Sequence, residues 1–268
     1  MRSELTQAEI ESYHENGFVV IHDFLTDNEL EAWRDAVGEA VETRGEARLP
    51  GEEGKKFGGS DSAVFKQRLQ LWMDHDKVRA LMLDERIGKM AADLEGVDGI
   101  RVWHDQTLIK MPWGNPTSWH QDNPKWSFTS DHAVSIWIAL DEVTTHNGCL
   151  YFVPGSHHER YEDVGTSRPM AEIFQQNPAL QSVDPVPAPM RAGACSFHNG
   201  LTVHGAGANM TRGARRAMTC AFMPDGSTYN GNKNVLPKAY AESLSVGDPI
   251  DNDDLVPLLY RRGVGSAP

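Results

Sequence analysis

Residues 119–122 (Trp-His-Gln-Asp) hold an imidazole and a carboxylate two positions apart. In an extended segment, side chains two residues apart point to the same face, so His120 and Asp122 can grip one metal ion together. The segment follows a turn-rich stretch, residues 113–116 (Trp-Gly-Asn-Pro), which comes directly after an expected strand. The His-x-Asp spacing is common by chance, so a metal site also requires a third ligand from elsewhere in the chain.

His204 supplies such a ligand, because it lies where an expected strand at residues 201–204 runs into a glycine-rich turn. Two histidines and one carboxylate on one face leave coordination positions open, which suits iron(II) that must also bind a cosubstrate and O₂. A structural zinc site would close all its positions, and the three cysteines have no paired spacing that would help it do so. We therefore predict His120, Asp122 and His204 as the metal ligands.

A different ligand set stays open at this point, because six other histidines fall near the expected strands. His198 and His204 in particular have a spacing compatible with neighbouring strands. The six are His104, His132, His146, His157, His158 and His198.

Arg215 begins an expected strand eleven residues beyond His204. A guanidinium offers a rigid fork of N–H donors that matches a carboxylate, so Arg215 could bind the far end of a dicarboxylate. An arginine on a strand is more often a solvated surface residue. Its position just behind the distal histidine favours the binding role.

The elements before residue 99 are mainly helical. Thr6 with Glu9 and Thr26 with Glu29 form capping boxes that start two helices, the second running to about Glu42. A short strand is expected between them at residues 18–21, and helical patterning resumes over residues 64–94. Residues 44–61 are rich in glycine and charge, which predicts a surface loop and a candidate lid.

Strand-like runs separated by turn residues dominate after Gly99. The fold class predicted is α+β, mainly β, with a sandwich or barrel packed against helices. We expect one domain over residues 1–268, with a helical layer containing one strand (1–98), a jelly-roll core (99–225) and a C-terminal tail (226–268). The expected strands span residues 101–111, 133–140, 149–153, 194–197, 201–204 and 215–223.

The composition excludes several kinds of partner. The formal charge of -13 disfavours nucleic acid and anionic membrane surfaces, and no apolar stretch is long enough for a membrane helix. A polar N-terminus and three unpaired cysteines predict a cytoplasmic protein. The acidic tail (Asp248, Asp251, Asp253, Asp254) is interpreted as a solvated face, which leaves homo-oligomerisation through it open. Trp113, Trp126 and Phe128 either line a substrate pocket or cover the barrel mouth.

A series of short motifs in order resembles the phytanoyl-CoA dioxygenase-like (PhyH) family of iron(II)- and 2-oxoglutarate-dependent oxygenases. The resemblance covers most of the chain and is specific through the order and spacing of its motifs. They are Asn-Gly-Phe-Val-Val-Ile (16–21), Phe-Leu-Thr (24–26), Trp-His-Gln-Asp (119–122), Trp-Ile-Ala-Leu-Asp (137–141), Asn-Gly-Cys-Leu (147–150), Val-Pro-Gly-Ser-His (153–157), His-Gly (204–205) and Arg-Arg-Ala-Met (215–218).

The resemblance implies a double-stranded β-helix core, buttressed by the N-terminal helices. It implies that His120, Asp122 and His204 bind iron(II), and that Arg215 pairs with the distal carboxylate of 2-oxoglutarate. Trp137 resembles the position whose ring lies along this cosubstrate.

Further cosubstrate contacts implied by the resemblance are Gln121 and Lys66, and Gln106 is expected to face the same pocket. Relatives often carry a hydroxyl two residues past the distal histidine, where this chain has Ala206. One cosubstrate hydrogen bond is therefore expected to be missing or rerouted.

The implied activity is oxidation of a small organic molecule by O₂, coupled to conversion of 2-oxoglutarate into succinate and CO₂. A carboxylate at Asp122 favours hydroxylation, desaturation or ring closure, because halogenating members of the wider superfamily have a small residue there. Two alternatives are a cofactor-independent jelly-roll metalloenzyme, which would not need Arg215, and a non-catalytic jelly-roll binding module, which would not need three metal ligands.

Overall fold

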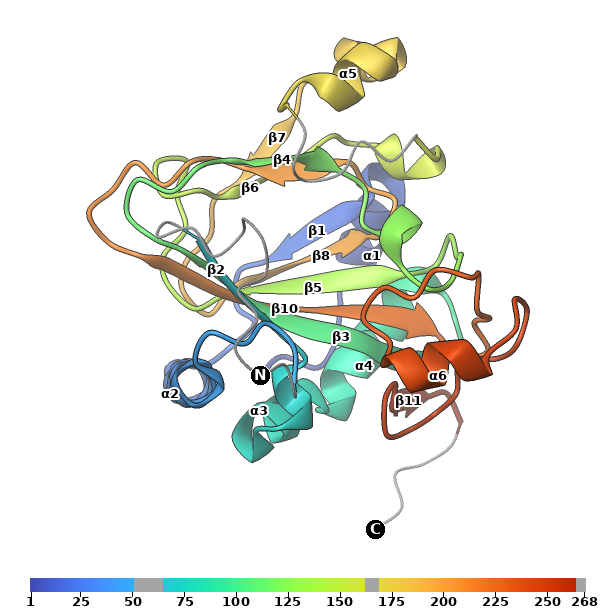
Figure 1. The fold of residues 1–268 in the computed structure, drawn as a ribbon. Helices are drawn as coiled ribbons and strands as arrows, with labels where there is room; N and C mark the ends of the chain where they lie inside the picture. Colours follow the sequence, from blue (N-terminus) through green and yellow to red (C-terminus); the bar gives the residue numbers. More distant parts are fainter. Residues whose placement is uncertain (51–64, 162–168, 264–268) are drawn as a thin grey trace.

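Two antiparallel β-sheets face each other in the computed structural model, which describes residues 1–50, 65–161 and 169–263 (Figure 1). The large sheet has the order β1-β8-β5-β10-β3-β11, with β2 also paired to β3, and the small sheet has the order β4-β9-β6-β7. This is the double-stranded β-helix, or jelly roll, that the sequence predicts. The strands are β1 (Phe18–Ile21), β2 (Phe65–Leu69), β3 (Gly99–Lys110), β4 (Thr117–His120), β5 (Val134–Ala139), β6 (Leu150–Phe152), β7 (Val186–Ala188), β8 (Cys195–Asn199), β9 (His204–Ala206), β10 (Arg215–Pro224) and β11 (Leu258–Arg261).

Strand β5 shows how the large sheet separates two environments. All six of its residues are buried, since both faces of the sheet are covered. Val134, Ile136 and Ile138 pack into the cluster shared with the helices, whereas Trp137 packs into the cluster between the two sheets. Because strand side chains alternate, Ser135 and Trp137 share the interior face.

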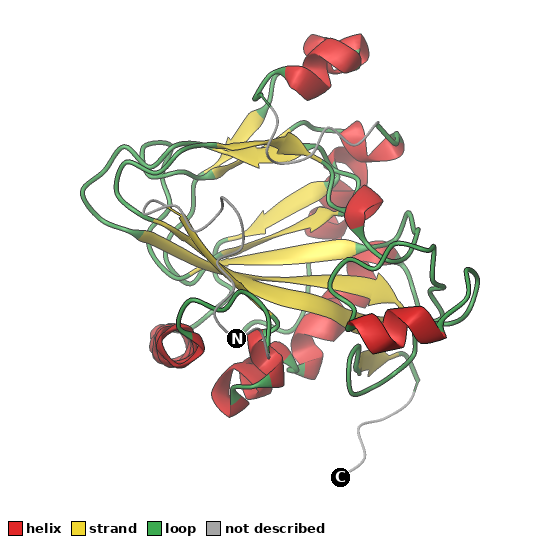
Figure 2. Cartoon of the chain, viewed as in Figure 1, coloured by secondary structure: helices red, strands yellow, loops and turns green. Residues whose placement is uncertain are grey.

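Helices cover the outer face of the large sheet, where α2, α3 and α4 lie beneath it in the view of Figure 2. Thr6 and Thr26 each accept a hydrogen bond from the N–H three residues later, and both capping boxes form as predicted. Each cap contributes about 1 kcal/mol by satisfying a free helix N–H. The α-helices are α1 (Gln7–Asn16), α2 (Asp27–Arg44), α3 (Asp76–Met82), α4 (Glu85–Glu95), α5 (Glu172–Gln176) and α6 (Lys238–Ser243), with short 3₁₀ turns η1 (Leu71–Met73), η2 (Asn123–Lys125), η3 (Ser156–His158) and η4 (Pro178–Ser182).

Two expectations about local structure were wrong. The helical pattern expected from residue 64 does not hold for Phe65–Leu69, which pairs as strand β2 along the edge of β3. The strand expected at residues 201–204 begins only at His204, because the Thr202 N–H turns back to the Asn199 carbonyl. Residues 51–61 of the candidate lid expected over residues 44–61 lie outside the described residues.

The C-terminal tail packs against the barrel through its apolar residues, whereas Asp251, Asp253 and Asp254 are exposed, as expected for a solvated face. Tyr229, Ile250 and Val256 are buried in one cluster with Trp103 and Phe128. Asp253 pairs with Arg101 at 2.6 Å, which ties the tail to strand β3.

Trp126 lies buried in the same cluster, so it and Phe128 pack beneath the tail, whereas Trp113 is exposed. Among the described residues, no helix is long and apolar enough to span a membrane.

Candidate metal centre

The three predicted ligands come together at the edge between the two sheets. One ligand atom from each of His120, Asp122 and His204 lies within 4.8 Å of the other two. His120 ends β4 and His204 begins β9, and these two residues are direct partners in the register of the small sheet. Asp122 follows two residues later, and its Oδ1 atom lies 3.4 Å from Nε2 of His120.

Both histidines are held in the orientation that a metal ligand needs. Nδ1 of His120 lies 2.8 Å from the Ser118 carbonyl, and Nδ1 of His204 lies 2.9 Å from the Thr202 carbonyl. A carbonyl can only accept, so each Nδ1 carries the proton and each Nε2 presents its lone pair. This arrangement fixes the tautomer of a metal-binding imidazole before any metal arrives.

The backbone around the ligands is equally constrained. The N–H of Asp122 donates to the Gly200 carbonyl at 3.0 Å, which joins the β4 end to the turn that leads into His204. At Gly205, an added Cβ would lie 2.9 Å from the Thr117 carbonyl and 3.3 Å from the Trp119 ring. Only glycine therefore lets β4 and β9 approach closely enough for His120 and His204 to meet.

The electrostatics of the centre suit a cation. Burial lowers the pKa of His204 well below its ordinary value, and the neighbouring His120 lowers it further. Burial alone would raise the pKa of Asp122, but His204 and the other nearby imidazoles hold it well below its ordinary range. The site thus presents an ionised carboxylate and a neutral imidazole at neutral pH, which are the states that bind a metal.

Arg215 lies buried at the other end of the interior face, 2% exposed. Its Nη2 atom donates to the Gly148 carbonyl at 3.0 Å, and its Nε atom has no hydrogen-bond partner among the described residues. Its Cζ atom lies 5.1 Å from the centre of the Trp137 ring. A buried guanidinium with a free N–H and an aromatic wall fits a ligand carboxylate.

The positions of Gln106 and Lys66 follow from strand register. Gln106 pairs with Thr219, and Thr219 pairs with Trp137, so Gln106 and Trp137 share the interior face. The Gln106 amide oxygen accepts from Gln67 of β2. Lys66 is exposed and alternates with Gln67, so it points to the opposite face. Contact of either residue with a cosubstrate stays a prediction.

Gln121 has a structural role in the protein. Its amide N–H groups donate to the carbonyls of Glu159 and Leu201, and its Oε1 atom accepts from the Tyr161 N–H at 3.0 Å. It therefore ties the segment around residue 160 to the metal-binding turn. A cosubstrate contact at Gln121 stays a prediction, and its two N–H donors are already in use.

The six histidines that stayed open as alternative ligands separate into two groups. His132, His146 and His158 are exposed, and His157 is half-buried. His104 and His198 are buried on the interior face, and burial lowers the pKa of His104 to about 4. Neither belongs to the cluster of three ligands, although Nε2 of His198 lies 3.6 Å from Asp122.

Two residues that sequence reasoning missed also lie on the interior face. Ser135 places its hydroxyl 3.5 Å from Oδ2 of Asp122, and Lys110 lies opposite Arg215 in the strand register. Alternation along the expected strand 133–140 would have placed Ser135 beside Trp137. The pairing of Lys110 with Arg215 depends on a register that the sequence does not give.

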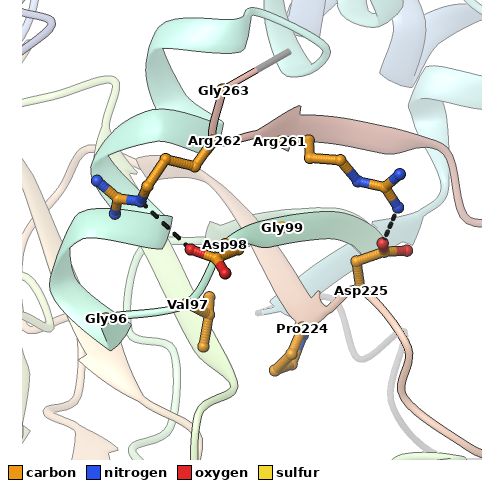
Figure 3. A pocket seen from close by; sticks show the side chains of 9 residues that line it. All are labelled: Gly96, Val97, Asp98, Gly99, Pro224, Asp225, Arg261, Arg262 and Gly263. Carbon is orange, nitrogen blue, oxygen red and sulfur yellow. Dashed lines mark hydrogen bonds and ion pairs between the residues drawn. The ribbon is translucent and has the colours of Figure 1, made fainter.

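Two surface hollows lie away from the ligands. One, of about 680 Å³, is lined by Asp225, Arg261 and Arg262, and its arginines pair with acids: Arg261 with Asp225, and Arg262 with Asp98 at 3.6 Å (Figure 3). Its charged groups therefore satisfy one another.

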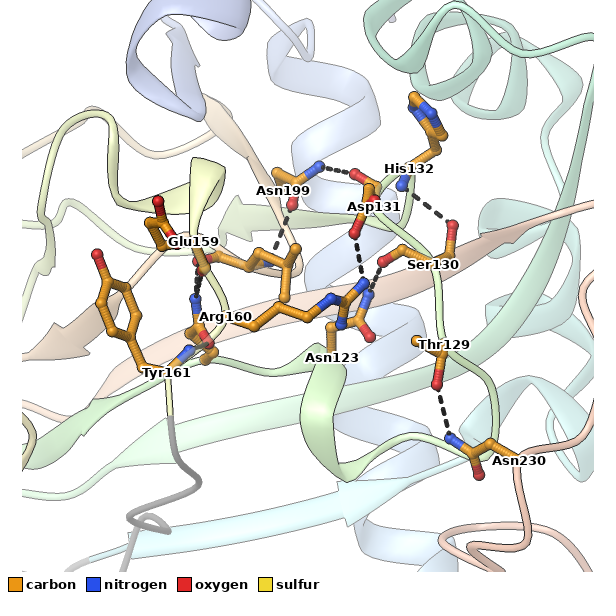
Figure 4. A network of polar contacts seen from close by, with 12 residues as sticks. Asn123, Thr129, Ser130, Asp131, His132, Glu159, Arg160, Tyr161, Asn199 and Asn230 are labelled. Atoms are coloured by element: carbon orange, nitrogen blue, oxygen red, sulfur yellow. Dashed lines mark hydrogen bonds and ion pairs between the residues drawn. The ribbon is translucent and has the colours of Figure 1, made fainter.

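The other hollow, of about 720 Å³, is bordered by His132, Asp131, Arg160 and Asn199. Asn199 donates to the Asp131 carbonyl at 2.7 Å, and Arg160 pairs with the Asp131 carboxylate (Figure 4). These contacts tie the strand β8 end to the loop before β5, which again is a structural role.

Comparison with known proteins agrees with the fold. The chain matches the family described as Phytanoyl-CoA dioxygenase (PhyH) over residues 13–217. The chain belongs to this family.

Individual relatives are similar over most of their length. Peroxisomal phytanoyl-CoA dioxygenase of Rattus norvegicus is 28% identical over 251 residues, which cover 87% of this chain and 72% of the relative. A methylphosphonate hydroxylase of Gimesia maris is 25% identical over 226 residues, covering 83% of this chain and 82% of the relative.

Among solved structures, the non-heme alpha-ketoglutarate-dependent carbocyclase SnoK from nogalamycin biosynthesis superposes with a TM-score of 0.79. It is 30% identical and covers 95% of this chain and 96% of its own. The epimerase SnoN, solved in complex with Fe³⁺, alpha-ketoglutarate and a nogalamycin compound, gives a TM-score of 0.77 at 29% identity. It covers 94% of this chain and 98% of its own. Iron and alpha-ketoglutarate, which the SnoN complex contains, are the metal and cosubstrate expected from the sequence, and the His–Asp–His triad suits them.

Proposed function

We propose that this protein is an iron(II)- and 2-oxoglutarate-dependent oxygenase that oxidises a small organic molecule. The supporting observation is that the triad and a buried arginine lie along one interior face. Ser135 contacts Asp122, and Trp137, two residues further along β5 and about 7 Å away, contacts Arg215. A ligand that chelates the metal through one end and carries a carboxylate at the other end fits between them.

Each residue has a distinct task in this proposal. His120, Asp122 and His204 hold the metal on one side and leave its other positions open. Arg215 binds the distal carboxylate, and Trp137 forms a wall that excludes water from it. The bound iron supplies O₂ activation coupled to decarboxylation of 2-oxoglutarate, which yields succinate and CO₂.

The proposed reaction is hydroxylation or a related removal of hydrogen, such as ring closure or desaturation. Asp122 supports this choice, because the carboxylate is present and leaves no ligand position free for a halide. The names of the relatives mention methylphosphonate, phytanoyl-CoA and nogalamycin biosynthesis. Because these compounds differ widely in chemistry, the proposal covers small organic molecules as a class.

An anaerobic titration tests the proposal. Iron(II) is added to the purified protein and then 2-oxoglutarate, while the visible charge-transfer band of an iron–2-oxoglutarate chelate is recorded. We expect the band with the natural protein and its loss in His204→Ala. If iron binds but 2-oxoglutarate produces neither a band nor a change in iron affinity, the cosubstrate assignment is wrong and a cofactor-independent metalloenzyme becomes the better explanation.

A further inference from the structure

His198 is a buried histidine for which the proposed reaction has no use. It lies on β8, facing the interior, opposite Ser135 of β5 and Phe18 of β1. Its residue is 3% exposed, and its ring centre lies 4.6 Å from that of His204 and 5.4 Å from that of Phe152. Neither ring nitrogen has a hydrogen-bond partner among the described residues. A buried imidazole must carry at least one N–H, so it requires an acceptor.

The acceptor nearest to this ring is the carboxylate of Asp122. Nε2 of His198 lies 3.6 Å from Oδ2 of Asp122, and the Ser135 hydroxyl lies 3.5 Å from the same oxygen. A closure of about half an ångström would bring both separations into the hydrogen-bond range. The other oxygen, Oδ1, lies instead toward Nε2 of His120 at 3.4 Å.

The orientation of His198 differs from that of the two histidine ligands. His120 and His204 each have Nδ1 bound to a backbone carbonyl, which leaves Nε2 unprotonated for a metal. Within residues 1–50, 65–161 and 169–263, no carbonyl bonds to Nδ1 of His198, so the proton can reside on Nε2. It also falls outside the group of three side chains whose ligand atoms converge.

We propose that His198, assisted by Ser135, is a positioning residue that donates an Nε2–H hydrogen bond to the oxygen of Asp122 not used by the metal. The proposal rests on the metal centre of the proposed function. A metal bound to one carboxylate oxygen leaves the second oxygen in a poorly solvated site, where lack of a donor is costly. The two donors keep the carboxylate from rotating, so Oδ1 stays on the side of His120, whose Nε2 lies 3.4 Å away.

Cobalt(II) binding tests this role without catalysis, because its visible spectrum reports ligand geometry. The variants are His198→Leu, which removes the donor, and His198→Gln, whose amide nitrogen can replace Nε2. We expect His198→Leu to weaken cobalt(II) binding about 10- to 100-fold, as loss of an outer partner of a ligand does. We expect His198→Gln to stay within about 3-fold of the natural protein and to keep its spectrum.

Two further variants serve as comparison. Ser135→Ala should weaken binding in the same direction and by less than His198→Leu. Ser196→Ala is the matched control. Ser196 lies on the same strand and the same face as His198, and its buried hydroxyl has no hydrogen-bond partner among the described residues. This variant should leave both affinity and spectrum unchanged.

The outcomes separate this proposal from the proposed function. If His198→Leu binds cobalt(II) as the natural protein does, the positioning role is wrong and the metal centre stands. If His198→Leu and His198→Gln lose cobalt(II) affinity equally, or if Ser196→Ala loses as much, general packing explains the loss. The positioning role is wrong in that case too. If the natural protein binds no cobalt(II), the metal centre itself is wrong.

Discussion

The two ends of the interior face differ in the sign of their buried charge. At one end, the Asp122 carboxylate lies among the imidazoles of His120, His198 and His204. At the other end, Arg215 and Lys110 are direct partners in the strand register, and neither has an ion-pair partner in the described part of the chain. A buried charge without a counter-ion is costly. A bound cation would therefore stabilise the first end, and a bound anion would stabilise the second.

Lys110 shows how the protein limits that cost. Its Nζ atom donates to the Gly207 carbonyl at 2.6 Å. Burial and the neighbouring Arg215 together lower the pKa of Lys110 to about 7. The amine is thus partly neutral near pH 7, whereas the guanidinium stays charged. Under the proposed function, the metal would balance the charge at the first end, and the distal carboxylate of 2-oxoglutarate would balance it at the second.

The largest expected effect comes from the metal end. His204→Ala leaves two of three ligands, so iron(II) affinity should fall by more than about 100-fold, beyond the loss of an outer partner. Succinate formation should fall with it. Calorimetric titration with iron(II) under anaerobic conditions measures the loss. If the variant kept its iron affinity, the metal would bind elsewhere, and this end of the interior face would not be the metal site.

The next effect comes from the opposite end. Arg215→Ala should weaken 2-oxoglutarate binding by about 2–5 kcal/mol, the usual effect of truncating one partner of a buried charge pair. Iron(II) affinity should hardly change, since Arg215 contacts none of the ligands. The KM for 2-oxoglutarate and an iron titration measure the two ends separately.

Arg216→Ala is the matched control for that experiment. Arg216 is adjacent on β10, half-buried, and pairs with Asp141 at 2.7 Å. Its loss should leave the KM for 2-oxoglutarate within about 3-fold, because Arg216 alternates with Arg215 along β10 and points to the opposite face of the sheet. If both variants raised the KM equally, the distal-carboxylate role of Arg215 would be excluded.

A smaller effect should appear at Lys110. A dicarboxylate beside Arg215 favours the charged amine and raises the pKa of Lys110, so binding at pH 8 should take up a proton. The expected uptake is at most about one proton per site. Calorimetry in two buffers of different ionisation enthalpy measures it, and Lys110→Met should abolish it. Unchanged uptake in Lys110→Met would assign the proton to another group.

Substitution of Asp105, on the outer face of the large sheet, should have the smallest effect on ligand binding. Burial raises the pKa of Asp105 to about 7, although it accepts from the Trp72 N–H at 3.1 Å. Since the folded protein then holds a proton that the unfolded chain releases near pH 4, the free energy of unfolding falls as the pH rises from about 4 to about 7.

Asp105→Asn keeps the acceptor and removes this titration. The variant's advantage over the natural protein in free energy of unfolding should grow by about 2–3 kcal/mol between pH 5 and pH 8. Urea unfolding at the two pH values measures it, and iron(II) affinity should not change. An advantage independent of pH would show that Asp105 does not hold the proton.

Local signals explain which features the sequence predicted. Asp122 stands two residues from His120, and Thr6 and Thr26 cap helices through residues three positions away. These patterns need no knowledge of the fold. Ser135 and Lys110 were missed because their roles depend on which distant strands pair and in which register. Strand β2 was taken for helix because only its pairing with β3 determines its conformation.

The pairing of β1 with β8 sets a delay during synthesis. Residues 18–21 form hydrogen bonds with residues 195–198, and β1 lies at the edge of the large sheet. At about 5–20 residues per second, the ribosome needs roughly 10–35 seconds to make the second strand after the first. During this time the apolar β1 segment cannot pair with β8. His204 is also not yet available to join His120 and Asp122. Under the proposed function, iron could bind to all three ligands only after most of the chain has been made, because His204 is the last of them to be synthesised.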